Sequence, residues 1–289
     1  MIQHAGRFAP SPTGSLHQGS LLASTASYLD ARARGLQWWL RIDDLDTPRV
    51  APGAEDAIRK TLDAHALHWD GPVIHQSGHI ARYEAALATL SAQGLLFYCT
   101  CTRAMLADET IYPGSCRHRT APVAGAAIRV LVEDRPVRFH DLVRGDQEEV
   151  LARTCGDFVV RRRDGQIAYQ LATAVDDGSE AISHVVRGGD LLDNTARQIY
   201  LMERLGLTVP SYAHLPVLVD ASGQKLSKQT HAPAVVDDRA SANLLVVFRY
   251  LGLDPPAEAR HWSPAVLLDW AIPRFDLKRV QAASVTARD

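Results

Sequence analysis

Short apolar runs alternate with longer segments of helical periodicity over the first third of the chain. The runs at residues 7–10 and 38–42 predict buried strands, and residues 19–34 between them place Ala and Leu at helical spacing. A strand, a helix and a second strand in this order predict a right-handed crossover between parallel strands. The helical pattern returns at residues 54–66 and 80–93. We therefore expect a Rossmann-type, doubly wound parallel sheet of the α/β class, a fold that binds nucleotides.

Composition changes after residue 98, where Cys, Pro, Gly and Arg become frequent. Residues 1–98 are therefore assigned to the first nucleotide-binding half, and residues 99–166 to an inserted α+β segment. Short alternating stretches predict antiparallel strands inside the insertion, at residues 127–132, 137–142 and 158–161.

Helical and apolar patterns resume after the insertion. Residues 167–230 are expected to form the second half of the parallel sheet, so that the catalytic unit is split in sequence. The two helices and the strand expected here cover residues 170–175, 195–205 and 214–219. Residues 231–289 are too few for a large extra domain, and the pattern at 241–251 predicts a short helical C-terminal region.

Charge and composition narrow the classes of protein. The 31 Lys and Arg residues against 33 Asp and Glu give a net charge of −2, so a nucleic-acid partner would have to bind local basic patches. No apolar run approaches the ~18 to 20 residues of a membrane span, and the N-terminus lacks the pattern of a signal peptide. Four cysteines are too few for a disulfide-stapled secreted domain. We expect a cytoplasmic protein with neither a membrane nor a DNA partner.

The loop after the first predicted strand carries a candidate phosphate site. It contains PSPTG at residues 10–14 and HQGS at residues 17–20, and it opens directly into the first predicted helix. The unpaired N–H groups at the start of a helix attract phosphate, and small residues allow close approach of a nucleotide. His17 and Thr13 add side-chain donors. The loop alone is equally compatible with a turn punctuated by Pro and Gly.

A second candidate phosphate site lies far downstream, in the sequence KLSKQ at residues 225–229. It places the ammonium groups of Lys225 and Lys228 three residues apart, an arrangement suited to a leaving pyrophosphate. Such a pair is also common on solvated surfaces, so its meaning depends on the rest of the chain.

Together these segments resemble the class I aminoacyl-tRNA synthetases, in which a HIGH-type motif opens the first helix and a KMSKS-type loop closes over ATP. RFAPSPTGSLHQGS at residues 7–20, RIDDLD at 41–46 and VVRGGDLL at 185–192 are similar to the glutamyl branch in particular. The resemblance extends from residue 6 to about residue 229. It implies the catalytic-domain fold of that class.

The resemblance also implies an activity. The chain ends soon after the KMSKS-type loop, too early for the anticodon-binding region of a glutamyl-tRNA synthetase. The shortened form of this branch activates L-glutamate with ATP and Mg²⁺ without tRNA, then attaches it to queuosine in the anticodon of tRNA(Asp). We expect that activity from a monomer. The alternatives are a glutamyl-tRNA synthetase that charges the tRNA 3′ end, and a catalytically silent tRNA-binding or zinc-dependent interaction module.

A glutamate pocket follows residue by residue from the resemblance. Arg7 and Arg187 are expected to clamp carboxylate, and Tyr169 to shape the pocket, while Ser11 and Asp43 receive the α-ammonium. The segment around Arg7 adds Phe8, Ala9 and Pro10 to the glutamate-binding residues. Asp43 departs from the family, which has Glu at this place, so a tighter pocket, a bridging water or a contribution from Asp44 is expected.

For ATP, the resemblance implies in-line attack of the glutamate α-carboxylate on the α-phosphorus, with no enzyme nucleophile. His17, Thr13, Lys225 and Lys228 are the expected catalytic residues. The expected ATP-binding residues are His17, Gly19, Ser20, Lys225 and Lys228. Ser20 stands at the fourth position of the HIGH-type motif and Gln229 at the last position of the KMSKS-type motif, and each substitution removes one side-chain donor.

Three of the cysteines form a candidate metal site. Cys99, Cys101 and Cys116 lie within eighteen positions, and soft ligands at this spacing in a reducing compartment favour zinc over a disulfide. The resemblance implies Tyr112 as the fourth ligand, whereas His118 is the competitor on chemical grounds. A closed tetrahedral site would be structural. Three free thiols are the alternative, and Cys155 is expected to be a packed thiol.

Overall fold

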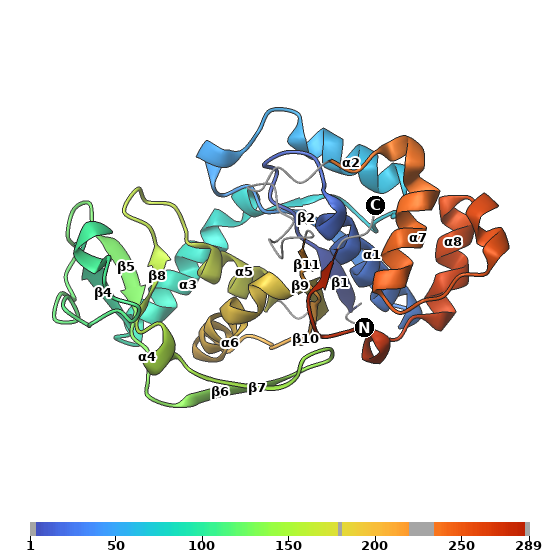
Figure 1. The fold of residues 1–289 in the computed structure, drawn as a ribbon. Coiled ribbons are helices and arrows are strands. Elements are labelled where there is room, and N and C mark those ends of the chain that lie inside the picture. The colour runs from blue at the N-terminus through green and yellow to red at the C-terminus, as the bar shows by residue number, and fades with distance from the viewer. Residues whose placement is uncertain (1–3, 179–180, 220–233, 287–289) are drawn as a thin grey trace.

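A computed structural model describes residues 4–178, 181–219 and 234–286 (Figure 1). Its centre is a seven-stranded mixed sheet in the order β3-β2-β1-β9-β10-β6-β7. All neighbouring strands are parallel except β7, which pairs antiparallel with β6. In sheet order the strands are Ile74–His75, Gln37–Ile42, Ala5–Phe8, Ile182–Gly188, Ser211–Leu215, Pro136–Asp141 and Gly145–Val150. The expected α/β fold with a parallel sheet is confirmed.

Helices cover both faces of this sheet (Figure 1). On one face lie α1 (Gln18–Ala33), α2 (Ala54–Ala64), α7 (Ala240–Tyr250) and α8 (Pro264–Ala271). The other face is covered by α3 (Ile80–Ala92), α5 (Tyr169–Asp177) and α6 (Leu192–Leu205). The C-terminal segment is therefore helical, as expected, and it packs on the face that carries α1.

Alternation along the strands explains the two layers of core. In β9, Val186 packs with the α1 layer whereas Val185 packs with the α6 layer, because successive side chains of a strand point to opposite faces. In β10, Ala213 and Tyr212 divide in the same way. A sheet buried on both faces needs both sets of apolar residues.

A separate three-stranded antiparallel sheet lies at the end of the molecule opposite α7 and α8 (Figure 1). It consists of β4 (Leu96–Cys99), β5 (Ala127–Val130) and β8 (Phe158–Arg161). The short helix α4 (Leu151–Thr154) precedes β8. Two of the three strands expected in the insertion, at residues 127–132 and 158–161, are in this sheet.

The third expected strand, at residues 137–142, was wrongly assigned to the insertion. It forms β6, whose antiparallel partner is β7 and whose other edge joins β10 in parallel. Alternation correctly indicated an antiparallel strand, but it carries no information about which sheet the second edge of that strand joins. The sheet that β6 joins is determined by burial, because Val137 packs into the core beneath α6.

The sequence pattern did not predict β9, and it placed the next strand at residues 214–219, whereas β10 covers Ser211–Leu215. The polar residues Ser183, His184 and Arg187 interrupt the apolar run of β9, although the strand is central in the sheet. The run at residues 214–219 divides in the structure, since β10 ends at Leu215 and the next strand pairs elsewhere. That strand, β11 (Leu218–Val219), pairs with β12 (Val285–Thr286). Within the described residues, no helix is both long and apolar enough to cross a bilayer.

Candidate active site

A cavity of about 300 Å³ opens at the carboxyl ends of the central parallel strands, where doubly wound sheets bind ligands. Its wall is built from the loop after β1, the start of α1, the end of β2, the start of α5 and the segments that follow β9 and β10. Twelve residues expected to bind substrate line it: Arg7, Phe8, Ala9, Pro10, Ser11, Thr13, His17, Gly19, Ser20, Asp43, Tyr169 and Arg187. Lys225 and Lys228 lie outside the described residues.

The loop after β1 is held so that α1 starts at the cavity. The backbone N–H of Asp43 donates to the Pro10 carbonyl at 3.0 Å, which ties the loop to the end of β2. Gly14 has a φ of +139°, a backbone conformation that residues with a side chain rarely adopt. His17 is the N-cap of α1, and its Nδ1 accepts the N–H of Ser20 at 3.3 Å. The ring is thereby fixed at the helix start.

Gly189, which directly follows β9, allows a close approach between the ends of two strands. A Cβ at this position would lie 2.5 Å from the carbonyl oxygen of Leu215 and 2.6 Å from the guanidinium of Arg144. The end of β9 therefore packs against the end of β10 only with glycine here.

Buried arginines and carboxylates alternate at the base of the cavity. Arg7 donates to both oxygens of Asp177, at 3.1 and 2.7 Å, and Arg41 donates to the same carboxylate at 2.6 Å. Arg41 also binds Asp43. All four side chains are between 1% and 7% exposed. Burial raises the pKa of Asp177, but the charges of Arg7 and Arg41 outweigh it and hold that pKa well below its ordinary value.

The two consecutive aspartates after β2 have different surroundings. Asp43 is buried beside Arg41 and lines the cavity. Burial raises the pKa of Asp43 above its ordinary value despite Arg41. Asp44 instead accepts from the N–H and the hydroxyl of Ser77, at 2.8 and 2.6 Å. Asp44 is not among the residues that line the cavity.

Sequence reasoning assigned no role to Arg41 or Asp177. Arg41 stands in the RIDDLD motif, so a signal was available: a buried strand that ends in Arg and Asp predicts an ion pair. Asp177 ends α5 and gave no signal, because its partner Arg7 is 170 positions away.

Arg187 reaches the cavity from β9 and is nearly buried, with 4% of its surface exposed. Its Nε donates to Nε2 of His214 at 3.0 Å, and its Nη2 donates to Oγ1 of Thr195 at 2.9 Å. Its Nη1 is buried and has no hydrogen-bond partner among the described residues. A buried charged donor without an acceptor is costly, so this nitrogen is suited to an anionic ligand group.

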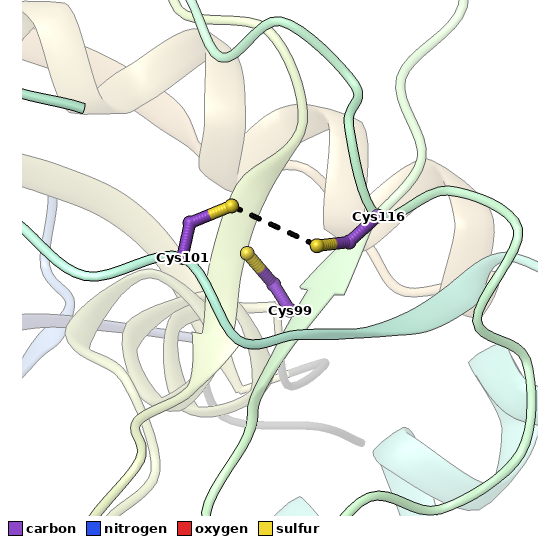
Figure 2. Close-up of side chains that lie close together, drawn as sticks. All are labelled: Cys99, Cys101 and Cys116. Carbon is purple, nitrogen blue, oxygen red and sulfur yellow. Dashed lines mark hydrogen bonds between the residues drawn. The ribbon is translucent and has the colours of Figure 1, made fainter. Parts of the chain in front are cut away.

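The three cysteines converge at the end of the molecule that carries the three-stranded sheet (Figure 2). Their sulfur atoms all lie within 4.8 Å of one another, and those of Cys101 and Cys116 are 3.7 Å apart. Two thiolates on one tetrahedral zinc ion would lie about 3.8 Å apart for Zn–S bonds of about 2.3 Å. The donor set and its spacing therefore fit zinc.

Tyr112 adjoins the three sulfur atoms. Its hydroxyl is 3.5 Å from Sγ of Cys99 and accepts the N–H of Cys116 at 3.0 Å. His118 is exposed and is not part of the cysteine group. Burial raises the pKa of Cys116, but hydrogen bonds from Thr100 and Tyr112 outweigh it and lower that pKa to about 6. Cys155 lies apart from the group, and its thiol contacts the Leu151 carbonyl.

Comparison with known proteins gives the family of the chain. The family model "tRNA synthetases class I (E and Q), catalytic domain" matches residues 5–245. Glutamyl-Q tRNA(Asp) synthetase of Thiobacillus denitrificans is 48% identical over 98% of this chain and 97% of its own length. Glutamyl-Q tRNA(Asp) synthetase of Neisseria meningitidis serogroup C is also 48% identical, over 98% of this chain and 99% of its own.

Solved structures agree with this. A glutamate tRNA ligase from Elizabethkingia meningosepticum, in complex with its amino acid, superposes with a TM-score of 0.82 at 25% identity. The match covers 99% of this chain and 67% of that one. The glutamate-tRNA synthetase of Elizabethkingia anophelis has a TM-score of 0.81 at 26% identity, over 98% of this chain and 68% of that one.

Proposed function

Since the chain belongs to the class I tRNA synthetase family for glutamate and glutamine, we propose that it activates L-glutamate with ATP and transfers it to queuosine in the anticodon of tRNA(Asp). The observation that carries activation is the convergence, in one cavity, of the buried Arg187 guanidinium and the start of α1. The choice of queuosine and tRNA(Asp) is supported by the relatives that match nearly end to end and bear that name.

The proposed reaction has two steps. An oxygen of the glutamate α-carboxylate attacks the α-phosphorus of ATP, the bond to the β-phosphate breaks, and pyrophosphate leaves. A nucleophilic group of queuosine then attacks the carbonyl carbon of the glutamyl-adenylate, and AMP leaves. The protein contributes orientation and charge stabilisation to both steps, so it requires no nucleophile of its own.

In the proposed glutamate pocket, Arg187 and Arg7 hold carboxylate, Tyr169 forms one wall, and Asp43 with Ser11 receives the α-ammonium. Asp177 accepts from Nε and from one N–H of Nη2 of Arg7, so a bond from Arg7 to the substrate can use Nη1 or the second N–H of Nη2. The buried Arg41 keeps Asp43 next to the cavity. The shorter Asp is thereby fixed in place, which supports a tight pocket rather than one completed by Asp44.

In the proposed ATP site, the α1 start with His17, Thr13, Gly19 and Ser20 receives the α-phosphate. Lys225 and Lys228 are proposed to hold the β- and γ-phosphates. Mg²⁺ bound with ATP supplies charge neutralisation along the triphosphate. The three substrates of the proposed reaction, L-glutamate, ATP and tRNA, are present in the cytoplasm, where we place the protein.

We also propose a structural zinc ion held by Cys99, Cys101, Cys116 and Tyr112. Three sulfur atoms within 4.8 Å of one another, two of them 3.7 Å apart as expected for a tetrahedral site, and the adjoining Tyr112 hydroxyl support it. The group lies outside the residues that line the cavity, which supports a structural rather than a catalytic role.

Glutamate-dependent exchange between pyrophosphate and ATP, measured without tRNA, tests the proposed activation. Robust exchange without tRNA supports the proposal. Exchange that needs tRNA(Glu) would identify an enzyme that charges the tRNA 3′ end. No exchange under either condition would identify a catalytically silent binding module.

A further inference from the structure

A buried chain of polar side chains crosses three neighbouring strands and ends at the cavity. Asp141 is the last residue of β6, His214 lies in β10 and Arg187 lies in β9, and these strands are adjacent in the sheet. His214 and Arg187 are register partners, so their side chains share one face. Asp141 and His214 are 0% exposed. Each link of the chain is therefore shielded from water.

Hydrogen-bonding partners determine where the proton of His214 resides. Nε of Arg187 can only donate, and it lies 3.0 Å from Nε2 of His214, so Nε2 is the acceptor. Nδ1 then carries the proton and donates it to Oδ2 of Asp141 at 2.6 Å. Burial lowers the pKa of His214 below its ordinary value, and the charges of Arg187 and Arg144 act in the same direction, so that together they outweigh the hydrogen bond and charge of Asp141. The ring is therefore neutral near neutral pH.

Asp141 is anchored independently of the ring. Its Oδ1 accepts the backbone N–H groups of Val143 and Arg144, at 3.0 and 2.8 Å. Burial raises the pKa of Asp141, but the bonds from His214 and from these N–H groups outweigh it, so the pKa lies below its ordinary value. Asp141 is thus a fixed carboxylate that orients the imidazole.

Among the described residues, the other contacts of Arg187 leave Nη1 without a partner. Thr195 binds Nη2, and the guanidinium carbon lies 5.2 Å from the centre of the Tyr212 ring. The contacts with His214, Thr195 and the Tyr212 ring together fix the plane of the guanidinium. An arginine fixed in this way loses little freedom when it binds a carboxylate.

We infer that His214 is a positioning residue for glutamate: with its proton held by Asp141, it accepts from Nε of Arg187 and so presents Nη1 to a substrate carboxylate. This inference rests on the proposed function, in which Arg187 binds glutamate. Thr195 supports the same orientation through Nη2. His214 itself touches neither substrate nor reacting atoms, since it is not among the residues that line the cavity.

The substitution Asp141→Asn tests the inference with little change of shape. An asparagine keeps an oxygen for Val143 and Arg144 but offers an N–H to Nδ1 of His214. The ring is then driven to the tautomer with a proton on Nε2, facing the N–H of Arg187. We expect the glutamate KM in pyrophosphate exchange to rise about ten-fold or more, with the ATP KM within about two-fold of wild type.

Two substitutions of His214 extend the test. His214→Leu removes the acceptor for Arg187, so its glutamate KM should rise at least as far as that of D141N. His214→Gln can place an amide oxygen near the position of Nε2, so it should recover part of the loss. His140→Leu is the matched control, because His140 also binds an aspartate, Asp146, but is exposed on the same hairpin. This control should keep the wild-type glutamate KM.

Nitrogen-15 NMR of wild-type protein reports the tautomer of His214 whether or not the variants fold. A proton on Nδ1 is expected, and a proton on Nε2 would overturn the inference. Wild-type glutamate KM in D141N and H214L, with wild-type exchange intact, would also overturn it, as would equal rises in the glutamate and ATP KM values. Absence of exchange in the wild-type protein is a different result: it defeats the proposed function and, with it, a role for His214 in binding glutamate.

Discussion

Arg41 donates hydrogen bonds to both carboxylate oxygens of Asp43, from Nε to Oδ1 at 2.7 Å and from Nη2 to Oδ2 at 3.3 Å. The aspartate that departs from the glutamyl pattern is therefore held by a buried guanidinium at the wall of the cavity. Arg41 also donates to Asp177, and Asp177 accepts from Arg7 as well. The position of the ammonium-binding carboxylate is thus linked to one of the two arginines proposed to hold carboxylate.

Asp43→Asn is expected to weaken glutamate binding. It keeps the shape of the side chain but removes the charge proposed to face the α-ammonium. The glutamate KM in pyrophosphate exchange should rise about ten-fold, while the ATP KM stays within about two-fold. Asp44→Asn is the matched control, because Asp44 binds Ser77 away from the cavity. Equal effects of the two substitutions would contradict the assignment.

Asp177→Asn is expected to destabilise the fold, because it leaves Arg7 and Arg41 buried with too little negative charge. Breaking a buried pair typically costs about 3–5 kcal/mol of unfolding free energy, measurable by urea denaturation near pH 7.

The pH dependence of that difference follows from the lowered pKa of Asp177. The stabilisation by its carboxylate is complete above the unfolded-state pKa of about 3.9 and is lost as pH falls below it, towards the folded-state pKa. The gap in unfolding free energy between wild type and D177N should therefore narrow between about pH 5 and pH 3. A constant gap over this range would show that Asp177 does not act through its charge.

Zinc analysis of protein purified without chelator should give one zinc ion per chain. Cys116→Ala removes one of three sulfur ligands, so bound zinc should fall sharply, and the three-stranded sheet should become more susceptible to proteolysis. Cys155→Ala should retain wild-type zinc, since Cys155 lies outside the group. Wild-type protein without zinc would rule out the site. Tyr112→Phe and His118→Ala then separate the two candidate fourth ligands by which of them lowers zinc affinity.

Lys228→Ala is expected to abolish pyrophosphate exchange while the protein remains folded, because the leaving pyrophosphate loses a positive charge. Lys225→Ala should act in the same direction. Lys278→Ala provides a control at an exposed lysine of the C-terminal region. Thermal unfolding should be the same for all three variants. Wild-type exchange rates in K228A would refute its role.

The sequence predicted those parts of the molecule that depend on local pattern. Apolar runs and helical spacing predicted the first strand-helix-strand unit. The motifs that resemble glutamyl synthetases predicted twelve residues that line one cavity. Local sequence pattern did not predict the features that depend on pairing between residues far apart in the chain. The polar residues of β9 hid a central strand, and residues 137–142 were assigned to the wrong sheet. The pairs Arg7 with Asp177 and Asp141 with His214 join positions 170 and 73 apart, which no local rule connects.

The most direct test of the central claim follows transfer of radiolabelled glutamate from its adenylate to tRNA(Asp) that lacks the 3′-terminal adenosine, with and without queuosine in the anticodon. Removing that adenosine excludes charging at the 3′ end, so any label has to be attached elsewhere. We predict stable labelling of the queuosine-bearing tRNA(Asp) and none of the queuosine-free form. Label that requires the 3′-terminal adenosine and ignores queuosine would contradict the proposed function.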